Sequence, residues 1–164
     1  MATVYQTLTP GSADFLTSAF PQLVRSGASF PVTGLAYDAA IVEAAFWQIR
    51  AVNYGSGDLT VDIEWYAAVA TSGDVVWAAQ VAAMTPDADA QDIETKALAT
   101  ANTVTDTHLG TVGKRPHRAV VTVTNLDALA SQDDVWLRIA RNATGNTMAG
   151  DAILTLATVS YSDV

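Results

Sequence analysis

The sequence has no cysteine, and this absence removes three functional classes at once. A disulfide-stapled scaffold, a thiolate metal site and a cysteine nucleophile all need a side chain that the chain lacks. Histidine is almost as scarce: the chain has only His108 and His117, and neither stands in an HExxH-type spacing. Because no third histidine completes a ligand set, we expect no bound metal and no other cofactor.

Basic residues are also few. Lys and Arg total 8 against 17 Asp and Glu, so the formal charge is 8 − 17 = −9. Such a chain lacks the basic face that nucleic-acid phosphates or an anionic membrane surface require. No apolar run approaches the length of a membrane span, and the start, MATVYQTLTPGSADF, has no signal-peptide pattern. We therefore expect no nucleic-acid partner, no membrane partner, and synthesis in the cytoplasm.

Catalytic motifs are missing too. There is no GxSxG elbow, and the glycine-containing segments 55–58 and 143–146 do not open a helix with a following lysine, as a phosphate loop does. The acidic run that includes Asp87 and Glu94 departs from the calcium-loop template, because Asp92 stands at the glycine position and Leu98 at the final glutamate position. These patterns predict that the protein is not an enzyme.

What the chain does have is strand patterning. Half of its residues are hydrophobic, and TVDIEWY (60–66) and DVWLRIARN (134–142) alternate apolar with polar side chains. Further strands are expected at 2–8, 28–38, 42–52, 74–83, 118–125 and 151–163. With turn residues between them, they predict one all-β domain over 1–164, an antiparallel β-sandwich of the jelly-roll type, with a closed barrel as the alternative. Residues 1–40 fit either an N-terminal arm or simply the first strands.

Two local patterns carry their own expectations. The stretch FWQIRAVNYGSGDLTVDIEWY (46–66) predicts two long strands around a Gly/Ser turn, that is, a hairpin. The segment TPDADAQDIETKALAT (85–100) has a possible cap at Thr85, a proline next to it and early acids. It predicts one short helix or helical turn near 86–99.

Each of the four tryptophans adjoins another large apolar side chain: Phe46–Trp47, Trp65–Tyr66, Val76–Trp77 and Trp136–Leu137. Consecutive strand residues face opposite ways, so one member of each pair can enter the core and the other must lie on an outer face. An outer aromatic is covered by the chain itself, buried against another subunit, or open as a sugar-stacking platform. The residues alone leave these three interpretations open.

The segment GKRPHR (113–118) contains Lys114, Arg115 and Arg118, three of the eight basic residues. One interpretation is a contact with an acidic partner surface. The other is a loop whose proline sets up the next strand.

Longer stretches carry a family resemblance. DVWLRIARNATGNTMAGDAILTLATVSYSD, and the central LTVDIEWYAAVATSGDVVWAAQV, resemble small all-β proteins encoded among the structural genes of tailed bacteriophages. The residues that carry the likeness are Trp136, Arg138, Arg141, Gly150, Asp151, Ala152 and Tyr161. The chain departs from the pattern in its Ala-rich strands and its first forty residues.

The resemblance implies a structural virion protein, a capsid decoration (cement) protein that forms a homotrimer and binds the major capsid protein on the capsid surface. In that function, the expected interface residues are Thr3, Tyr5, Phe15 and Phe20 toward the capsid, Tyr66 and Trp136 between subunits, and Lys114, Arg115 and Arg118 toward acids. The alternative is a carbohydrate- or receptor-binding β-sandwich module, as in phage tail fibres or lectin-like proteins.

Overall fold

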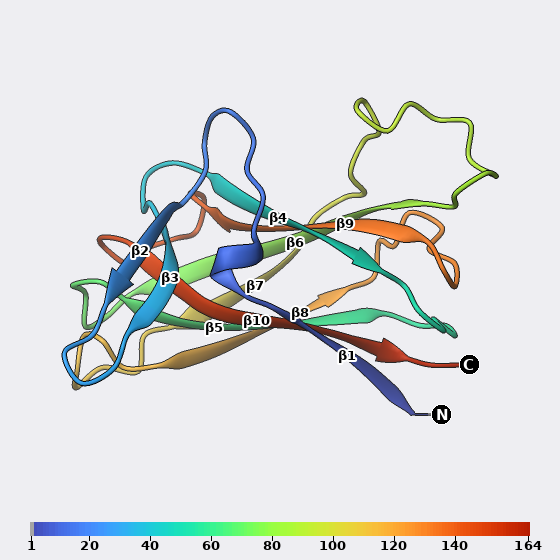
Figure 1. Ribbon diagram of the computed structural model, residues 1–164. Helices are drawn as coiled ribbons and strands as arrows, with labels where there is room; N and C mark the ends of the chain where they lie inside the picture. The colour runs from blue at the N-terminus through green and yellow to red at the C-terminus, as the bar shows by residue number, and fades with distance from the viewer. Residues whose placement is uncertain (1) are drawn as a thin grey trace.

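The computed structural model describes residues 2–164, which form two facing antiparallel β-sheets (Figure 1). Sheet A contains β1 (Thr3–Leu8), β2 (Gln22–Ser26), β3 (Val32–Tyr37), β5 (Leu59–Ala67), β8 (His117–Val123) and β10 (Ala152–Ser162). Sheet B contains β4 (Glu43–Arg50), β6 (Asp74–Met84), β7 (Asn102–Thr107) and β9 (Asp134–Asn142). A 3-10 turn, η1 (Pro10–Ser12), follows β1. No helix among the described residues is long and apolar enough to cross a membrane.

The strand order is that of a jelly roll. Sheet A runs β3-β10-β5-β8 and faces β4-β9-β6-β7 in sheet B, while β1 and β2 extend sheet A by pairing with β10 and β3. Eight core strands shared between two antiparallel sheets make up this fold. The predicted fold class is therefore confirmed, and the sheets do not close into a barrel.

The predicted hairpin over 46–66 is wrong. Strand β4 pairs with β9 in sheet B, whereas β5 pairs with β10 and β8 in sheet A. The connection 51–58 crosses the end of the core, where the buried Tyr54 ring meets Tyr161 edge-on at 5.7 Å. The crossing places Trp47 and Trp65 in one core from opposite sheets, and a hairpin within one sheet would not do this.

The side-chain alternation is as expected. Val61, Ile63 and Trp65 of β5 point into the core. So do Val135, Leu137 and Ile139 of β9, which face them from the other sheet. Edge-on aromatic contacts tie the layers together, with Trp77 5.2 Å from Tyr37 and 6.3 Å from Trp65 between ring centres.

The helix expected near 86–99 does not form. Only isolated turns occur, one in which the Asp89 amide donates to the Thr85 carbonyl and one closed between Thr95 and Asp92. Asp87 has φ +64°, a left-handed conformation that interrupts a right-handed helix. Further on, Ala99 donates its amide to a β6 carbonyl, so the segment ends extended beside the sheet.

Two strands escaped the sequence patterns, and both lie at sheet edges. Strand β2 is almost wholly exposed, and β7 carries the run NTVTDT, in which only Val104 is a packed apolar side chain. An edge strand with one wet face gives little apolar periodicity to detect.

The described part of residues 1–40 is built into the sandwich as β1, β2 and β3. Between η1 and β2, residues 13–21 form a loop along the free edge of β4. Asp14 exchanges two backbone hydrogen bonds with Phe46, and Ala44 donates to Ala19.

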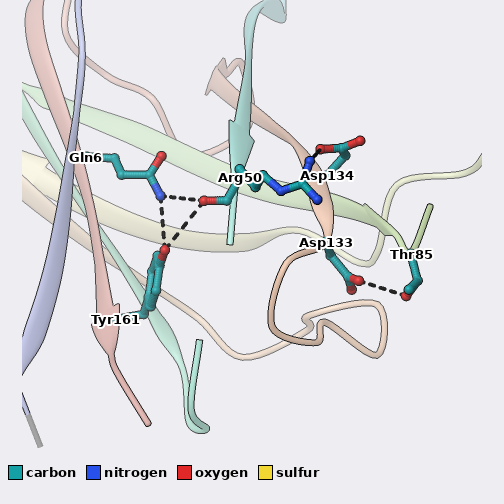
Figure 2. A network of polar contacts seen from close by, with 6 residues as sticks. All are labelled: Gln6, Arg50, Thr85, Asp133, Asp134 and Tyr161. Atoms are coloured by element: carbon teal, nitrogen blue, oxygen red, sulfur yellow. Dashed lines mark hydrogen bonds and ion pairs between the residues drawn. The ribbon is translucent and has the colours of Figure 1, made fainter. Parts of the chain in front are cut away.

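One end of the sandwich is closed by polar contacts between the sheets (Figure 2). Gln6 of β1 donates from Nε2 to the Arg50 carbonyl of β4 at 2.7 Å and to the Tyr161 hydroxyl of β10 at 3.0 Å. Nearby, the Thr85 hydroxyl donates to the buried Asp133 carboxylate at 2.7 Å. The second contact fixes the point where the chain leaves β6 for the 85–101 loop.

Candidate functional site

The outer face of sheet B carries most of the outward-pointing large side chains found by sequence. Of the four outer members of the tryptophan-containing pairs, Phe46, Val76 and Trp136 lie on this face, and Tyr66 lies on sheet A. The strand register sets three outward rows across β4, β9 and β6: Gln48–Trp136–Ala82, Phe46–Arg138–Gln80 and Ala44–Ala140–Ala78. The aromatic rows therefore adjoin a row of alanines, which are buried.

Two loops flank these rows. The 13–21 loop borders β4, and the 85–101 loop borders β6; in Figure 1 both project from the same side of the sandwich. Gln80 donates from Nε2 to the Ala99 carbonyl at 2.9 Å. Lys96 forms an ion pair with Asp127 at 3.0 Å, and its side chain is only 11% exposed. The 85–101 loop is thus fastened both to the sheet and to the turn after β8.

Between the loops and the sheet lies a hollow of about 500 Å³, which we call the sheet B groove. Phe15, Phe46 and Trp136 supply its aromatic surface. Its volume falls within the range of small-molecule binding sites, roughly 300–1,000 Å³. The groove combines side chains from the three strands β4, β9 and β6 and from two loops far apart in sequence.

Three of the four polar side chains that line the sheet B groove are free to bind, the exception being the ion-paired Lys96. Within residues 2–164, the carboxylates of Asp14 and Glu94 and the amide of Gln48 make no side-chain hydrogen bond or ion pair. Arg138 lies in the next row and differs, because it donates to Gln80 Oε1 at 2.6 Å and burial lowers its pKa. The groove thus offers aromatic faces together with unpartnered acceptors.

A second hollow of about 490 Å³ lies on the sheet A side, at the tip of the β2–β3 connection. Phe30, Tyr66, Pro116 and Lys114 line it, and the Tyr66 hydroxyl lies 3.2 Å from the Ser26 hydroxyl. It has fewer free polar groups than the sheet B groove.

The residues predicted as an interface are brought to three separate places. Phe15 and Trp136 line the sheet B groove, and Phe20 packs against Phe15 with ring centres 5.7 Å apart. Tyr66 and Lys114 line the second hollow. Sequence reasoning did not single out Asp14 and Glu94 as groove residues, because loop positions carry no periodicity.

The remaining predicted residues lie on or beside the sheet A surface. Thr3 and Tyr5 point outward from β1. Arg118 makes a two-point pair with Asp62 on the neighbouring strand, at 2.5 and 2.7 Å, so its charge is already met within the chain. Arg115 donates to the Leu109 carbonyl at 3.4 Å.

The two histidines, distant from any motif, come together inside the molecule. Their ring centres are 4.4 Å apart, and His117 stacks on Trp65 at 4.5 Å. His117 accepts the Leu109 amide at Nε2, while His108 accepts the Gly110 amide at Nδ1 and bonds to the Gly113 carbonyl through Nε2. Burial, followed by the neighbouring His108, lowers the pKa of His117. Through these hydrogen bonds to backbone groups, the two rings hold the 109–116 loop in place.

Arg141, one of the residues that carry the phage-protein likeness, is fully buried. Its guanidinium donates to the side chain of Asn146 and to the carbonyls of Tyr37, Met148 and Gly150. Burial lowers the pKa of Arg141. With all its donors engaged, Arg141 orders the 142–151 loop and is not available to a partner.

Among the described residues, no group of three or more His, Asp or Glu side chains is placed to hold a metal ion. The sheet B groove also contains no histidine. The groove offers flat aromatic faces, two carboxylates, an amide and an ion-paired lysine.

Comparisons with known proteins give a similarity of shape only. No protein-family model and no curated protein matches the chain. One similar solved structure is a family 28 carbohydrate-binding module specific for non-crystalline cellulose, with 10% identity, TM-score 0.48, and coverage of 90% of this chain and 84% of that one. Another is the family 11 module from Clostridium thermocellum in complex with a β-1,3-1,4-mixed-linked tetrasaccharide, with 6% identity, TM-score 0.48 and coverage of 94% and 87%.

A third is the K1 cleaved adhesin domain of Lys-gingipain from Porphyromonas gingivalis, with 10% identity, TM-score 0.40 and coverage of 99% of both chains. At these identities and TM-scores, the similar structures assign no function to this chain.

Proposed function

We propose that the protein is a non-catalytic binding module that takes a glycan chain in the sheet B groove. The observation that carries the proposal is the outward Trp136, placed beside Phe46 in an open hollow with unpartnered polar groups. Sugar rings present an apolar face edged by hydroxyls, and a flat aromatic ring bordered by hydrogen-bonding groups complements both features.

The polar groups have the required variety. The Gln48 amide can donate and accept, and the carboxylates of Asp14 and Glu94 accept hydroxyl protons in charge-assisted hydrogen bonds. The strand pairing of β4 with β9 fixes Gln48 directly beside Trp136. A pre-formed arrangement of this kind limits the entropy lost on binding.

Tryptophan fluorescence tests the proposal directly. Trp47, Trp65 and Trp77 are buried, so a ligand in the groove reaches Trp136 alone. We expect at least one polysaccharide of a broad panel to change the emission of the native protein. The change should vanish in a Trp136→Phe variant of unaltered circular dichroism. If no polysaccharide changes the emission or binds in calorimetry, the proposal is wrong.

A second candidate function is supported by the N-terminal quarter of the chain. Tyr5, Leu16 and Phe30 are 65–70% exposed there, on β1, beside the sheet B groove and in the second hollow respectively, and exposed large apolar side chains are candidates for protein–protein contacts. We propose as the second candidate that this region docks onto a major capsid protein, as a capsid decoration (cement) protein of a virion does. The homotrimer and the capsid-surface location belong to this proposal.

Light scattering over a dilution series, followed by co-sedimentation with capsids, tests the second candidate. A stable trimer whose capsid binding is lost in a Tyr5→Ser/Phe30→Ser variant supports it. A monomer at every concentration that leaves capsids in the supernatant contradicts it. Neither result depends on glycan binding, so the two candidates are tested separately.

A further inference from the structure

We infer that the glycan recognised in the sheet B groove carries no negative charge, and that Asp14 and Glu94 exclude anionic glycans. This inference rests on the proposed function and adds the chemical class of the ligand. Uronate-containing, sialylated and sulfated chains are the ligands it rules out.

The first reason is the sign of the free groups in the groove. Asp14 and Glu94 approach the hollow from different loops, and both side chains are exposed and unpaired within residues 2–164. A neutral sugar hydroxyl donates to a carboxylate, whereas a sugar carboxylate or sulfate ester has only acceptors to offer at neutral pH. An anionic glycan therefore meets two groups of its own sign and no complementary donor from them.

The second reason is that the cation lining the groove is already neutralised. The Nζ atom of Lys96 lies 3.0 Å from the Asp127 carboxylate, and that carboxylate also accepts the Ala83 amide at 2.9 Å. Drawing Lys96 toward a ligand would leave a part-buried carboxylate without its counter-charge, which is costly. Arg138 lies one row away, is not among the groove-lining residues, and donates to Gln80.

The net charge of the whole protein is also negative, like that of the two groove carboxylates. The protein carries a formal charge of −9, so its long-range field repels polyanions. Discrimination of this kind depends on a repulsive element as much as on an attractive one. In the groove, the same two carboxylates act as both, since they accept hydroxyls from a neutral chain and repel an anionic chain.

Matched polysaccharides test the inference. Calorimetry would compare neutral glucans, galactans, mannans and xylans with carboxylated derivatives of the same backbones. We expect the neutral member of the recognised pair to bind at least about tenfold more tightly than the carboxylated member. This affinity gap should narrow as added salt shortens the Debye length. An Asp14→Asn/Glu94→Gln variant should reduce the gap to about threefold or less.

A control separates local from overall charge. Glu64→Gln removes one negative charge from the exposed outer face of sheet A, and its gap should remain that of the native protein. If carboxylated chains bind as tightly as neutral ones, or if the double variant keeps the full gap, the inference is overturned while glycan binding stands. If neither member of any pair binds, the proposed function fails, and the inference fails with it.

Discussion

The two outer faces of the sandwich differ although the same alternation of side chains produced both. On sheet B, the outward positions carry aromatic, amide and alanine side chains beneath two flanking loops. On sheet A, one outward row carries hydroxyls, with Thr60, Thr122 and Ser160 side by side and Tyr5 at its end. At the end of that row, the Tyr5 side chain is 69% exposed.

The difference shows that strand pattern alone does not make a site. Alternation decides only that a side chain points away from the core. On sheet B, the loops convert that position into buried alanines at one end and a walled groove at the other. Substitutions on the outer face of sheet B, each paired with a matched substitution on the outer face of sheet A, test this difference.

The largest effect is expected from a charge placed under the covered part of sheet B. Ala140 points outward yet is fully buried among Ala44 and Ala78. Ala140→Glu should lower the free energy of unfolding by about 3 kcal/mol, because the carboxylate loses water without gaining a partner. Ser160→Glu on sheet A should change it by less than about 0.5 kcal/mol. Urea denaturation measures both values, and similar losses would show that the alanine row is not covered.

The next effect concerns binding. Trp136→Ala should weaken glycan affinity by about 10- to 100-fold, since it removes the central aromatic face of the groove. Tyr5→Ala removes an exposed ring from sheet A and should leave affinity unchanged. Calorimetry with the best-binding neutral polysaccharide measures both. Equal losses in the two variants would move the binding site away from the groove.

A smaller effect is expected at the ion pairs of the two faces. Lys96→Met cuts the 85–101 loop from Asp127, and should cost about 1 kcal/mol of stability and weaken glycan binding a few-fold. Arg118→Met breaks the pair with Asp62 on the open face of sheet A, where solvent screens the charges. That variant should keep the thermal midpoint of the native protein, and its glycan affinity should also be unchanged. A Lys96 variant with native affinity would mean that the loop holds its place without the ion pair.

The smallest effect is a pH dependence on the inner side of sheet A. The pKa of His117 is lowered below its ordinary value of about 6.5, so the unfolded chain binds this proton more readily than the folded chain. The contribution of His117 to the free energy of unfolding is therefore complete above about pH 6.5, and it declines as the pH falls below that value. Denaturation between about pH 7.5 and 5.5, above the ordinary range of carboxyl groups, should show the decline.

His117→Gln is the matched variant, because its amide oxygen can still accept the Leu109 amide and does not titrate. Its stability should vary less over this pH interval than that of the native protein. An unchanged slope would assign the pH dependence to other groups.

Much of the fold could be predicted from the residues. The alternation in 60–66 and 134–142 correctly assigned the inward and outward side chains of β5 and β9. The pairs Phe46–Trp47 and Trp136–Leu137 correctly indicated that large side chains must reach an outer face. The side-chain pattern did not reveal the edge strands β2 and β7, where apolar alternation is weak. It also wrongly predicted a helix near 86–99, where only local capping signals supported one.

The site could be predicted only in part. Trp136 and Phe15 were named as interface residues, but nothing in their spacing placed them in one groove. Asp14 and Glu94 lie eighty positions apart on loops, and His108 and His117 meet only because their loop folds back on itself. Such contacts depend on how the chain closes in space.

The sequence by itself determined the fold class: an acidic, cysteine-free chain with period-two hydrophobicity folds as antiparallel sheets that each bury one face. It left open whether those sheets form a sandwich or close into a barrel. Tertiary structure alone decided that β4 and β5 separate into different sheets and that two loops wall one outer face. The reason is the distance along the chain between the residues that interact. Side-chain periodicity is set by neighbouring residues, whereas sheet assignment and loop position depend on contacts between residues far apart in the chain.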